Sequence, residues 1–145
     1  MKITSPSRCA AVFIPLLLIS VTGCNQTPGA SITGMNVKDV SLTDVTMVFD
    51  VKVDNPYLVS IPLGNLDYAL ASRGQQFLDG KATLQGTIPA QNSKTLPVPI
   101  RVNFLKLFGA VKGARPGASI PYKADMGLSL DLPMVGNKRL PMSKE

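Results

Sequence analysis

The sequence predicts an all-β protein, an antiparallel sandwich of two sheets with about seven strands and one short helix. Apolar and polar residues alternate with a period of two along most segments between Ile32 and Met142, as expected of strands that bury one face. Residues typical of turns, namely Gly, Pro, Asn and Asp, recur between these segments. Only one segment has a helical period, whereas a parallel α/β fold would need a helix between successive strands.

The other strands are expected to pack around the segment 43–54. Pro56 ends this strand, because proline has no N–H for the ladder and pushes Asn55 into an extended or turn conformation. We expect the Asn55-Pro56 pair to be structural, with the Asn55 side chain bonded to nearby backbone. A less regular strand at 32–40 is expected before the segment 43–54. The segment 43–54 is called the central strand, and its apolar side consists of Val45, Met47, Phe49, Val51 and Val53.

The next part of the chain predicts a hairpin. Residues 57–64 are expected to form a loop or a bulged crossing, followed by a strand from Asn65 that breaks at Arg73-Gly74. The segment 75–78 is then expected to turn at Asp79-Gly80, a hairpin signal, into a partner strand.

After a turn at 89–93, the strand 95–104 carries Pro97 and Pro99. Residues two apart in a strand aim their N–H groups at the same side, so these prolines delete two donors from one edge. We therefore predict that this strand borders its sheet and that the prolines discourage aggregation between edges.

The period then changes to that of a helix, which Asn103 can cap and which ends near Lys112. This helix is expected to plug one end of the sandwich. A long strand at 120–132, a turn at 133–138 and a last strand at 139–142 complete the fold. The apolar face predicted for the helix consists of Phe104, Leu107, Phe108 and Val111.

Residues 1–23 are predicted to be a lipoprotein signal peptide. Lys2 and Arg8 precede an apolar run, 9–22, that would reach about 21 Å as a helix, short of the roughly 30 Å core of a bilayer. The run ends in Val21, Thr22, Gly23 and Cys24, which resemble a bacterial lipobox in which Cys24 is lipidated. The alternatives are an ordinary secretory signal with a coincidental cysteine, or a buried apolar element.

Lipidation would make residues 24–31 an acylated N-terminus followed by a polar linker. Two or three acyl chains hold a protein durably on a membrane, whereas one does not. Cys9 would leave with the signal, so the mature chain would have no free thiol. Asn25 stands where Asp would retain a lipoprotein in the inner membrane, so in a Gram-negative host we expect the outer membrane, facing the periplasm.

Composition argues against catalysis and against nucleic-acid binding. There is no His, the commonest general base and metal ligand, and the net charge of +6 is scattered along the chain without aromatic residues among the basic ones. We find no nucleotide loop, nucleophile elbow or Cys/His metal spacing. No catalytic residue, metal, cofactor or small-molecule substrate is therefore predicted, and an enzyme that uses Ser, Lys or Tyr is the residual alternative.

Some carboxylates and basic residues of the chain are candidates for binding. Asp44, Asp50 and Asp54 share one face of the central strand, but Lys52 lies between them, so we interpret them as a solvated face rather than a Ca²⁺ site. A separate set of cations around the helix could meet anionic head groups, or could simply be solvated. This set consists of Lys106, Lys112 and Arg115.

The ordered motifs of the chain resemble the WHy domain (water stress and hypersensitive response) of the group 2 late embryogenesis abundant proteins. The resemblance runs from about Ile32 to Leu140, although Tyr57 replaces the second Asn that usually follows Asn-Pro. It implies a fibronectin-III-like or immunoglobulin-like domain over 32–145, without a known catalytic site, linked to desiccation and found in bacteria as lipoproteins. The motifs are Val51 to Pro56, Ile61 to Leu63, Leu66 to Tyr68, Gly80, Ile88 to Ala90, Leu96 to Ile100 and Pro121 to Lys123.

These observations lead to two functional hypotheses. The first is a non-enzymatic envelope lipoprotein that protects or contacts membrane or protein during water stress. The second is an interaction module that docks an envelope protein partner by strand addition or by its end loops.

Overall fold

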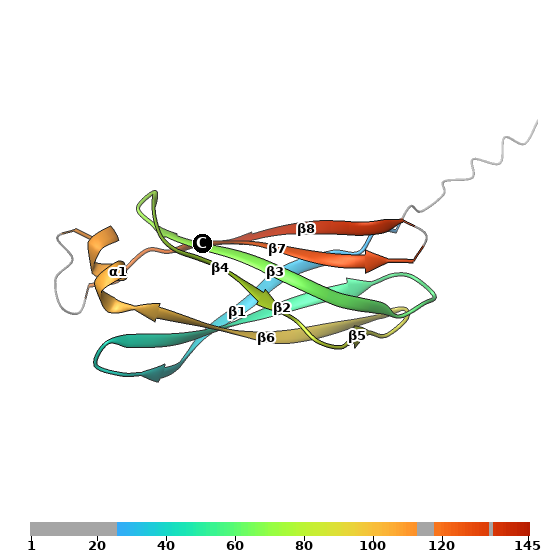
Figure 1. Cartoon of the computed structure of the whole chain (residues 1–145), viewed down its shortest axis with the longest axis horizontal. Helices are drawn as coiled ribbons and strands as arrows, with labels where there is room; N and C mark the ends of the chain where they lie inside the picture. Colours follow the sequence, from blue (N-terminus) through green and yellow to red (C-terminus); the bar gives the residue numbers. More distant parts are fainter. Residues whose placement is uncertain (1–25, 113–117, 134) are drawn as a thin grey trace, which may run out of the picture.

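Two antiparallel sheets pack face to face in the computed structural model, which describes residues 26–112, 118–133 and 135–145 (Figure 1). One sheet has the strand order β1 (Gly29–Val40), β2 (Asp44–Asn55) and β6 (Asn92–Asn103). The other has the order β4 (Gln75–Thr83), β3 (Ile61–Ser72), β7 (Lys123–Leu132) and β8 (Gly136–Lys144), with the short β5 (Thr87–Ile88) also paired to β3. The predicted two-sheet antiparallel sandwich is confirmed.

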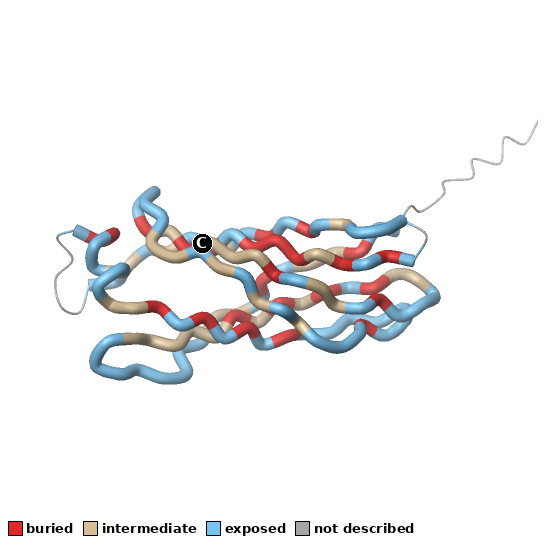
Figure 2. Tube along the Cα trace, in the orientation of Figure 1, coloured by how far each residue is buried: buried red, intermediate tan, exposed pale blue. Residues whose placement is uncertain are grey.

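The core lies between the sheets, where buried and exposed residues alternate along the strands (Figure 2). In β2 the side chains of Phe49, Val51 and Val53 are fully buried, whereas Val45 and Met47, nearer the start of the strand, are half-buried. Fully burying one such side chain contributes about 1.5–3 kcal/mol. The opposing sheet supplies the other half of this core through Ile61, Leu66, Leu70, Ala124, Leu128 and Leu130.

The prediction that the proline strand borders its sheet is confirmed. β6 pairs with β2 on one side and borders its sheet on the other. Pro97 lies opposite Asp50 and Pro99 opposite Val48. The two missing N–H groups therefore fall on a strand that has only one partner among the described residues, where their loss is tolerated.

The hairpin turn was predicted in the wrong place. It lies at Arg73-Gly74, where both residues have positive φ, 49° and 80°, and Ser72 pairs with Gln75. Such a two-residue turn matches the twist of the flanking strands. β4 instead runs straight through Asp79-Gly80. There Gly80 makes room for Tyr68, since a Cβ atom on Gly80 would lie 2.5 Å from the Tyr68 hydroxyl oxygen.

Several strand boundaries also differ from those expected, and β7 begins at Lys123 rather than at Ile120. β3 begins at Ile61, within the predicted loop, and absorbs the irregularity as a shift in register between Leu63 and Leu66. β8 begins at Gly136, which pairs with Leu132, so the last turn is shorter than predicted. β1 begins at Gly29, so the end of the expected linker pairs with β2.

The helix α1 (Phe104–Ala110) forms as predicted and covers one end of the sandwich, at the left in Figure 1. The Asn103 side chain caps it by accepting a hydrogen bond from the Leu105 N–H at 2.9 Å. Leu107 packs against the core, and Ala110 and Val111 are buried. Phe108 was expected to face inward as well, but it is 56% exposed.

Candidate functional site

Asn55 is the most highly connected polar side chain at the end of the sandwich opposite α1. It is the last residue of β2 and only 2% exposed. Its Nδ2 donates to the carbonyl oxygens of Val59 at 2.8 Å, Ile88 at 3.2 Å and Pro89 at 2.9 Å. Its Oδ1 accepts from the Tyr57 N–H at 3.0 Å. Because an amide nitrogen carries two hydrogens, the three carbonyls share them in part.

This arrangement follows from the Asn-Pro pair. Pro56 cannot continue the ladder, so the chain leaves β2 and turns back over Asn55. The side chain then satisfies backbone groups of its own loop and of the segment after β5. Buried backbone groups without such partners would cost free energy. Tyr57, which replaces an expected Asn, contributes only its backbone N–H to the hydrogen bonds of Asn55.

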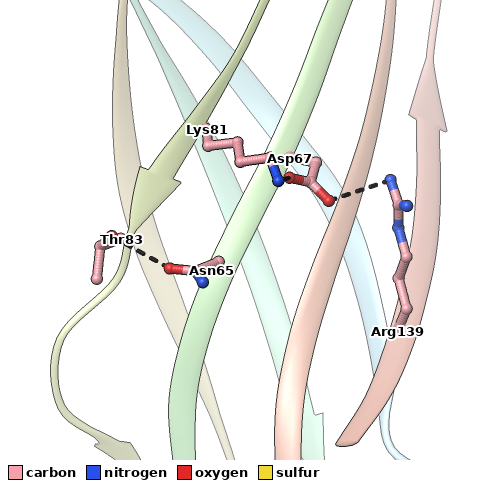
Figure 3. A network of polar contacts seen from close by, with 5 residues as sticks. All are labelled: Asn65, Asp67, Lys81, Thr83 and Arg139. Atoms are coloured by element: carbon pink, nitrogen blue, oxygen red, sulfur yellow. Dashed lines mark hydrogen bonds and ion pairs between the residues drawn. The ribbon is translucent and has the colours of Figure 1, made fainter.

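A charged cluster spans the outer face of the second sheet (Figure 3). Asp67 of β3 lies between two cations, Lys81 of β4 at 3.7 Å and Arg139 of β8 at 3.4 Å. To reach Asp67, Arg139 crosses over Gly127 of β7, where a Cβ atom would collide with the guanidinium group. Beside the cluster, the Thr83 hydroxyl donates to Oδ1 of Asn65 at 3.1 Å.

The cluster is suited to holding strands together rather than to catalysis. The Asp67 carboxylate is engaged by both Lys81 and Arg139, so it is not free to act as a base, and the cluster keeps one excess positive charge. The hollow beside it has a volume of about 480 Å³ and is open to solvent, and it lies over the small residue Ala69. Ion pairs this exposed contribute only about 0–1 kcal/mol each.

A second hollow, about 420 Å³, adjoins Asn55 and is lined by backbone and polar residues that include Gln91, Asn92 and Ser93. Asn55 itself has no unused polar group to offer a ligand there, since the four bonds above occupy both ends of its amide. Among the described residues, no buried side-chain nitrogen or oxygen lacks a partner.

Residues 50–145 match the model of the family LEA_2, described as late embryogenesis abundant protein. The chain belongs to the LEA_2 family. This LEA_2 protein is 34% identical over 118 residues to the Desiccation protectant protein Lea14 homolog of Glycine max, which covers 81% of this chain and 78% of that protein.

Solved structures agree with this membership. The solution structure of the late embryogenesis abundant protein At2g46140.1, which belongs to Arabidopsis thaliana, superposes with a TM-score of 0.69 at 29% identity, covering 81% of this chain and 68% of that one. The solution structure of AT1g01470 from Arabidopsis thaliana gives a TM-score of 0.68 at 31% identity, covering 79% and 76%. The LEA_2 sandwich is therefore the fold of this protein.

The residues singled out from the sequence lie at opposite ends of this LEA_2 domain. Asn55 and Pro56 lie at the end where β1 begins, since Gly29 pairs with Asp54. Lys106 and Lys112 are exposed at the other end, in and just after α1. The remaining candidates, Cys24, its lipobox residues Val21, Thr22 and Gly23, and Arg115, lie outside the described residues.

The carboxylates along β2 do not converge. The Asp50 carboxylate accepts from Asn36, Asp54 pairs with Lys52 at 3.4 Å, and Asp44 accepts from Thr43. Within the described ranges no group of three His, Cys, Asp or Glu side chains is placed to hold a metal ion. No helix in the same ranges is long and apolar enough to cross a membrane.

Two side-chain contacts of the structure were not predicted from the sequence. The first is the ion pair between Asp67 of β3 and Arg139 of β8, which spans the intervening strand β7. The second is a hydrogen bond of 2.6 Å from the buried Ser72 hydroxyl to the carbonyl oxygen of Pro121, 49 residues away. The only sequence signal for the first is Gly127, a glycine inside a strand, which often marks a close approach by another group.

Proposed function

We propose that this LEA_2 protein is a non-enzymatic lipoprotein of the WHy type, which protects membrane or protein when the cell loses water. Its lipid anchor would be Cys24, and its place the outer membrane, facing the periplasm. The observation that carries the protective role is membership of a family whose relatives bear the names desiccation protectant and desiccation-related protein.

The architecture supports a role as a scaffold. The polar groups that a catalytic site would use are occupied by the fold itself, most clearly at Asn55 and Asp67. The two hollows beside Asp67 and Asn55 are open to solvent, whereas ligand sites are usually enclosed.

An anchor at Cys24 is also compatible with the position of β1. Gly29 is five residues further along the chain, so at about 3.3–3.6 Å per residue the tether reaches at most about 18 Å. The Asn55 end of the sandwich, where β1 begins, would then be held close to the bilayer.

Metabolic labelling tests the anchor. Cells that express the full chain are grown with a clickable palmitate, and the purified protein is examined for label. We expect label on the wild type and on the Cys9→Ala variant, because Cys9 would leave with the signal, and none on Cys24→Ala. Equal labelling of Cys24→Ala would show that this cysteine is not the anchor.

The second candidate is docking of an envelope protein, and the structure favours the end loops over the sheet edges for this role. Prolines interrupt β6, two register shifts interrupt β1, β8 lies beside β1, and α1 packs beside β4. Such features are known to discourage strand addition. Leu58, by contrast, lies 79% exposed in the loop after β2.

Crosslinking from unstressed cells separates the two candidates. An interaction module should return one stoichiometric partner, and that partner should be lost in Leu58→Asp but retained in Gln75→Asp at the start of β4. A protective scaffold should return only scattered proteins from all three forms.

A further inference from the structure

Several large apolar side chains are exposed together at the α1 end of the sandwich. Leu42 is 100% exposed and Leu105 83% exposed. They come from two segments, the β1–β2 turn and α1, which the structure joins by a hydrogen bond of 2.9 Å from the Phe104 N–H to the Thr43 carbonyl oxygen. We call this group the apolar cap; it consists of Leu42, Leu105 and Phe108, together with Val37 and Val40 near the end of β1.

The turn that carries Leu42 is held rigidly in its outward position. The Ser41 N–H donates to the Asp44 carbonyl oxygen at 2.8 Å, and the Ser41 hydroxyl accepts from the Asp44 N–H at 2.9 Å. The full exposure of Leu42 is therefore built into the turn. Figure 2 shows the whole turn as exposed, projecting at the same end as α1.

The helix α1 also exposes apolar side chains, because both of its sides carry them. Leu107, Ala110 and Val111 face the sandwich, while Leu105 and Phe108 face solvent. The ring of Phe108 lies beside that of Phe104 on the same helix, with the ring centroids 6.0 Å apart. Single exposed apolar residues are ordinary on protein surfaces, but a cluster from separate segments usually marks an interaction surface.

The charges around the apolar cap and the exposure of its side chains indicate which kind of partner it fits. Lys38, Lys106 and Lys112 lie in or next to the two segments of the apolar cap. The acids there are Asp39 and Asp44, and the Asp44 carboxylate is engaged by Thr43 and Asn103. Leu42 lies in the projecting β1–β2 turn and Leu105 and Phe108 lie on the solvent side of α1, whereas the hollows described above are lined by other residues. Projecting apolar residues flanked by lysines fit the interface of an anionic bilayer.

We propose that the apolar cap inserts into the surface of an anionic lipid bilayer, with the flanking lysines on the head groups. This inference deepens the proposed protective function by naming a lipid surface as its target, but it does not require lipidation of Cys24. Because β1 is a 12-residue strand, the apolar cap lies about 40 Å from the end at which Cys24 would be anchored. The domain would thus contact lipid at a point distant from its tether.

The absence of Trp from the sequence makes the test direct. The full chain, with Cys24→Ala to remove the lipid, is reconstituted into vesicles of phosphatidylcholine with or without phosphatidylglycerol. One form carries Leu105→Trp in the apolar cap and another Leu42→Trp. The matched control carries Leu58→Trp, which is also exposed but lies at the opposite end. The N-terminal apolar run is the same in every form, so differences report the position of the tryptophan.

With phosphatidylglycerol present, the fluorescence of Leu105→Trp and Leu42→Trp should shift to shorter wavelength and be quenched by brominated acyl chains. That of Leu58→Trp should not respond to lipid charge. Adding Lys106→Gln and Lys112→Gln to Leu105→Trp should weaken insertion, by about fivefold for each lysine removed. Equal shifts at both ends, or no response to phosphatidylglycerol, would overturn the proposal. So would a shift without vesicles that grows with protein concentration, because the apolar cap would then bind a second copy.

Discussion

Asn55 and Pro89 are 34 residues apart in the chain, yet Nδ2 of Asn55 lies 2.9 Å from the carbonyl oxygen of Pro89. The same side chain accepts from the Tyr57 N–H. One buried amide thus ties the end of β2 to its own loop and to the segment after β5.

Asn55→Ala should therefore be strongly destabilising. It leaves a buried N–H and several carbonyls without a partner, and such groups cost about 1–3 kcal/mol each. We expect the free energy of unfolding to fall by about 3 kcal/mol, measured by chemical denaturation. Asn65→Ala, which removes only an exposed bond to Thr83, is the control and should change it by less than about 0.5 kcal/mol. Similar losses in both variants would contradict a special role for Asn55.

Gly64 and Gly109 should respond in opposite directions to replacement by alanine. A Cβ atom on Gly64 would lie 2.5 Å from the Ser129 carbonyl oxygen, a backbone atom that cannot easily move, so Gly64→Ala should cost about 1–3 kcal/mol. Gly109 in α1 has open space around it, so Gly109→Ala should stabilise by up to about 1 kcal/mol. Thermal melts of the two variants, read against the wild type, distinguish these effects, and shifts of the same sign would refute the packing described for β3 and β7.

The position of the hairpin turn gives a third prediction. Arg73 and Gly74 both have positive φ, a conformation that favours Asn followed by Gly. Arg73→Asn should stabilise the protein by a few tenths of a kcal/mol, and Gly74→Ala should destabilise it by about 1–2 kcal/mol. Denaturant midpoints report both changes. If Arg73→Asn destabilised the protein, the turn would have to be elsewhere.

The pair between Asp67 and Arg139 should be weak despite its central place on the sheet. Arg139 is 62% exposed, so a double-mutant cycle of Asp67→Ala and Arg139→Ala should give a coupling of about 0.2–1 kcal/mol that declines with added salt. A coupling well above this range, or one that salt does not reduce, would indicate a functional network rather than a surface clamp.

Much of the fold was predictable because a strand that buries one face has alternating apolar and polar residues in its sequence. The alternation in β2 identified Phe49, Val51 and Val53 as core, and the two prolines of β6 identified an edge. The hairpin was misplaced because Asp79-Gly80 has turn composition, while its glycine is needed for the approach of Tyr68. Only the packing of the strand opposite reveals that need.

The candidate site was predictable only in part, for similar reasons. The Asn-Pro pair marked a structural turn, but the three carbonyl partners of Asn55 depend on how two distant segments meet. Leu105 and Phe108 illustrate the same limit on the surface. The spacing of apolar residues predicted a helix at 104–111, but it placed Phe108 in the core, and only the packing of α1 shows that it faces solvent.

The central proposal is tested most directly by the survival of cells after drying. A strain that lacks the protein is complemented with the wild type, Cys9→Ala or Cys24→Ala, dried and rehydrated, and its viable cells are counted. The proposal predicts that the wild type and Cys9→Ala restore survival and that Cys24→Ala, folded but without the lipid, does not. Full restoration by Cys24→Ala, or undiminished survival without the protein, would contradict it.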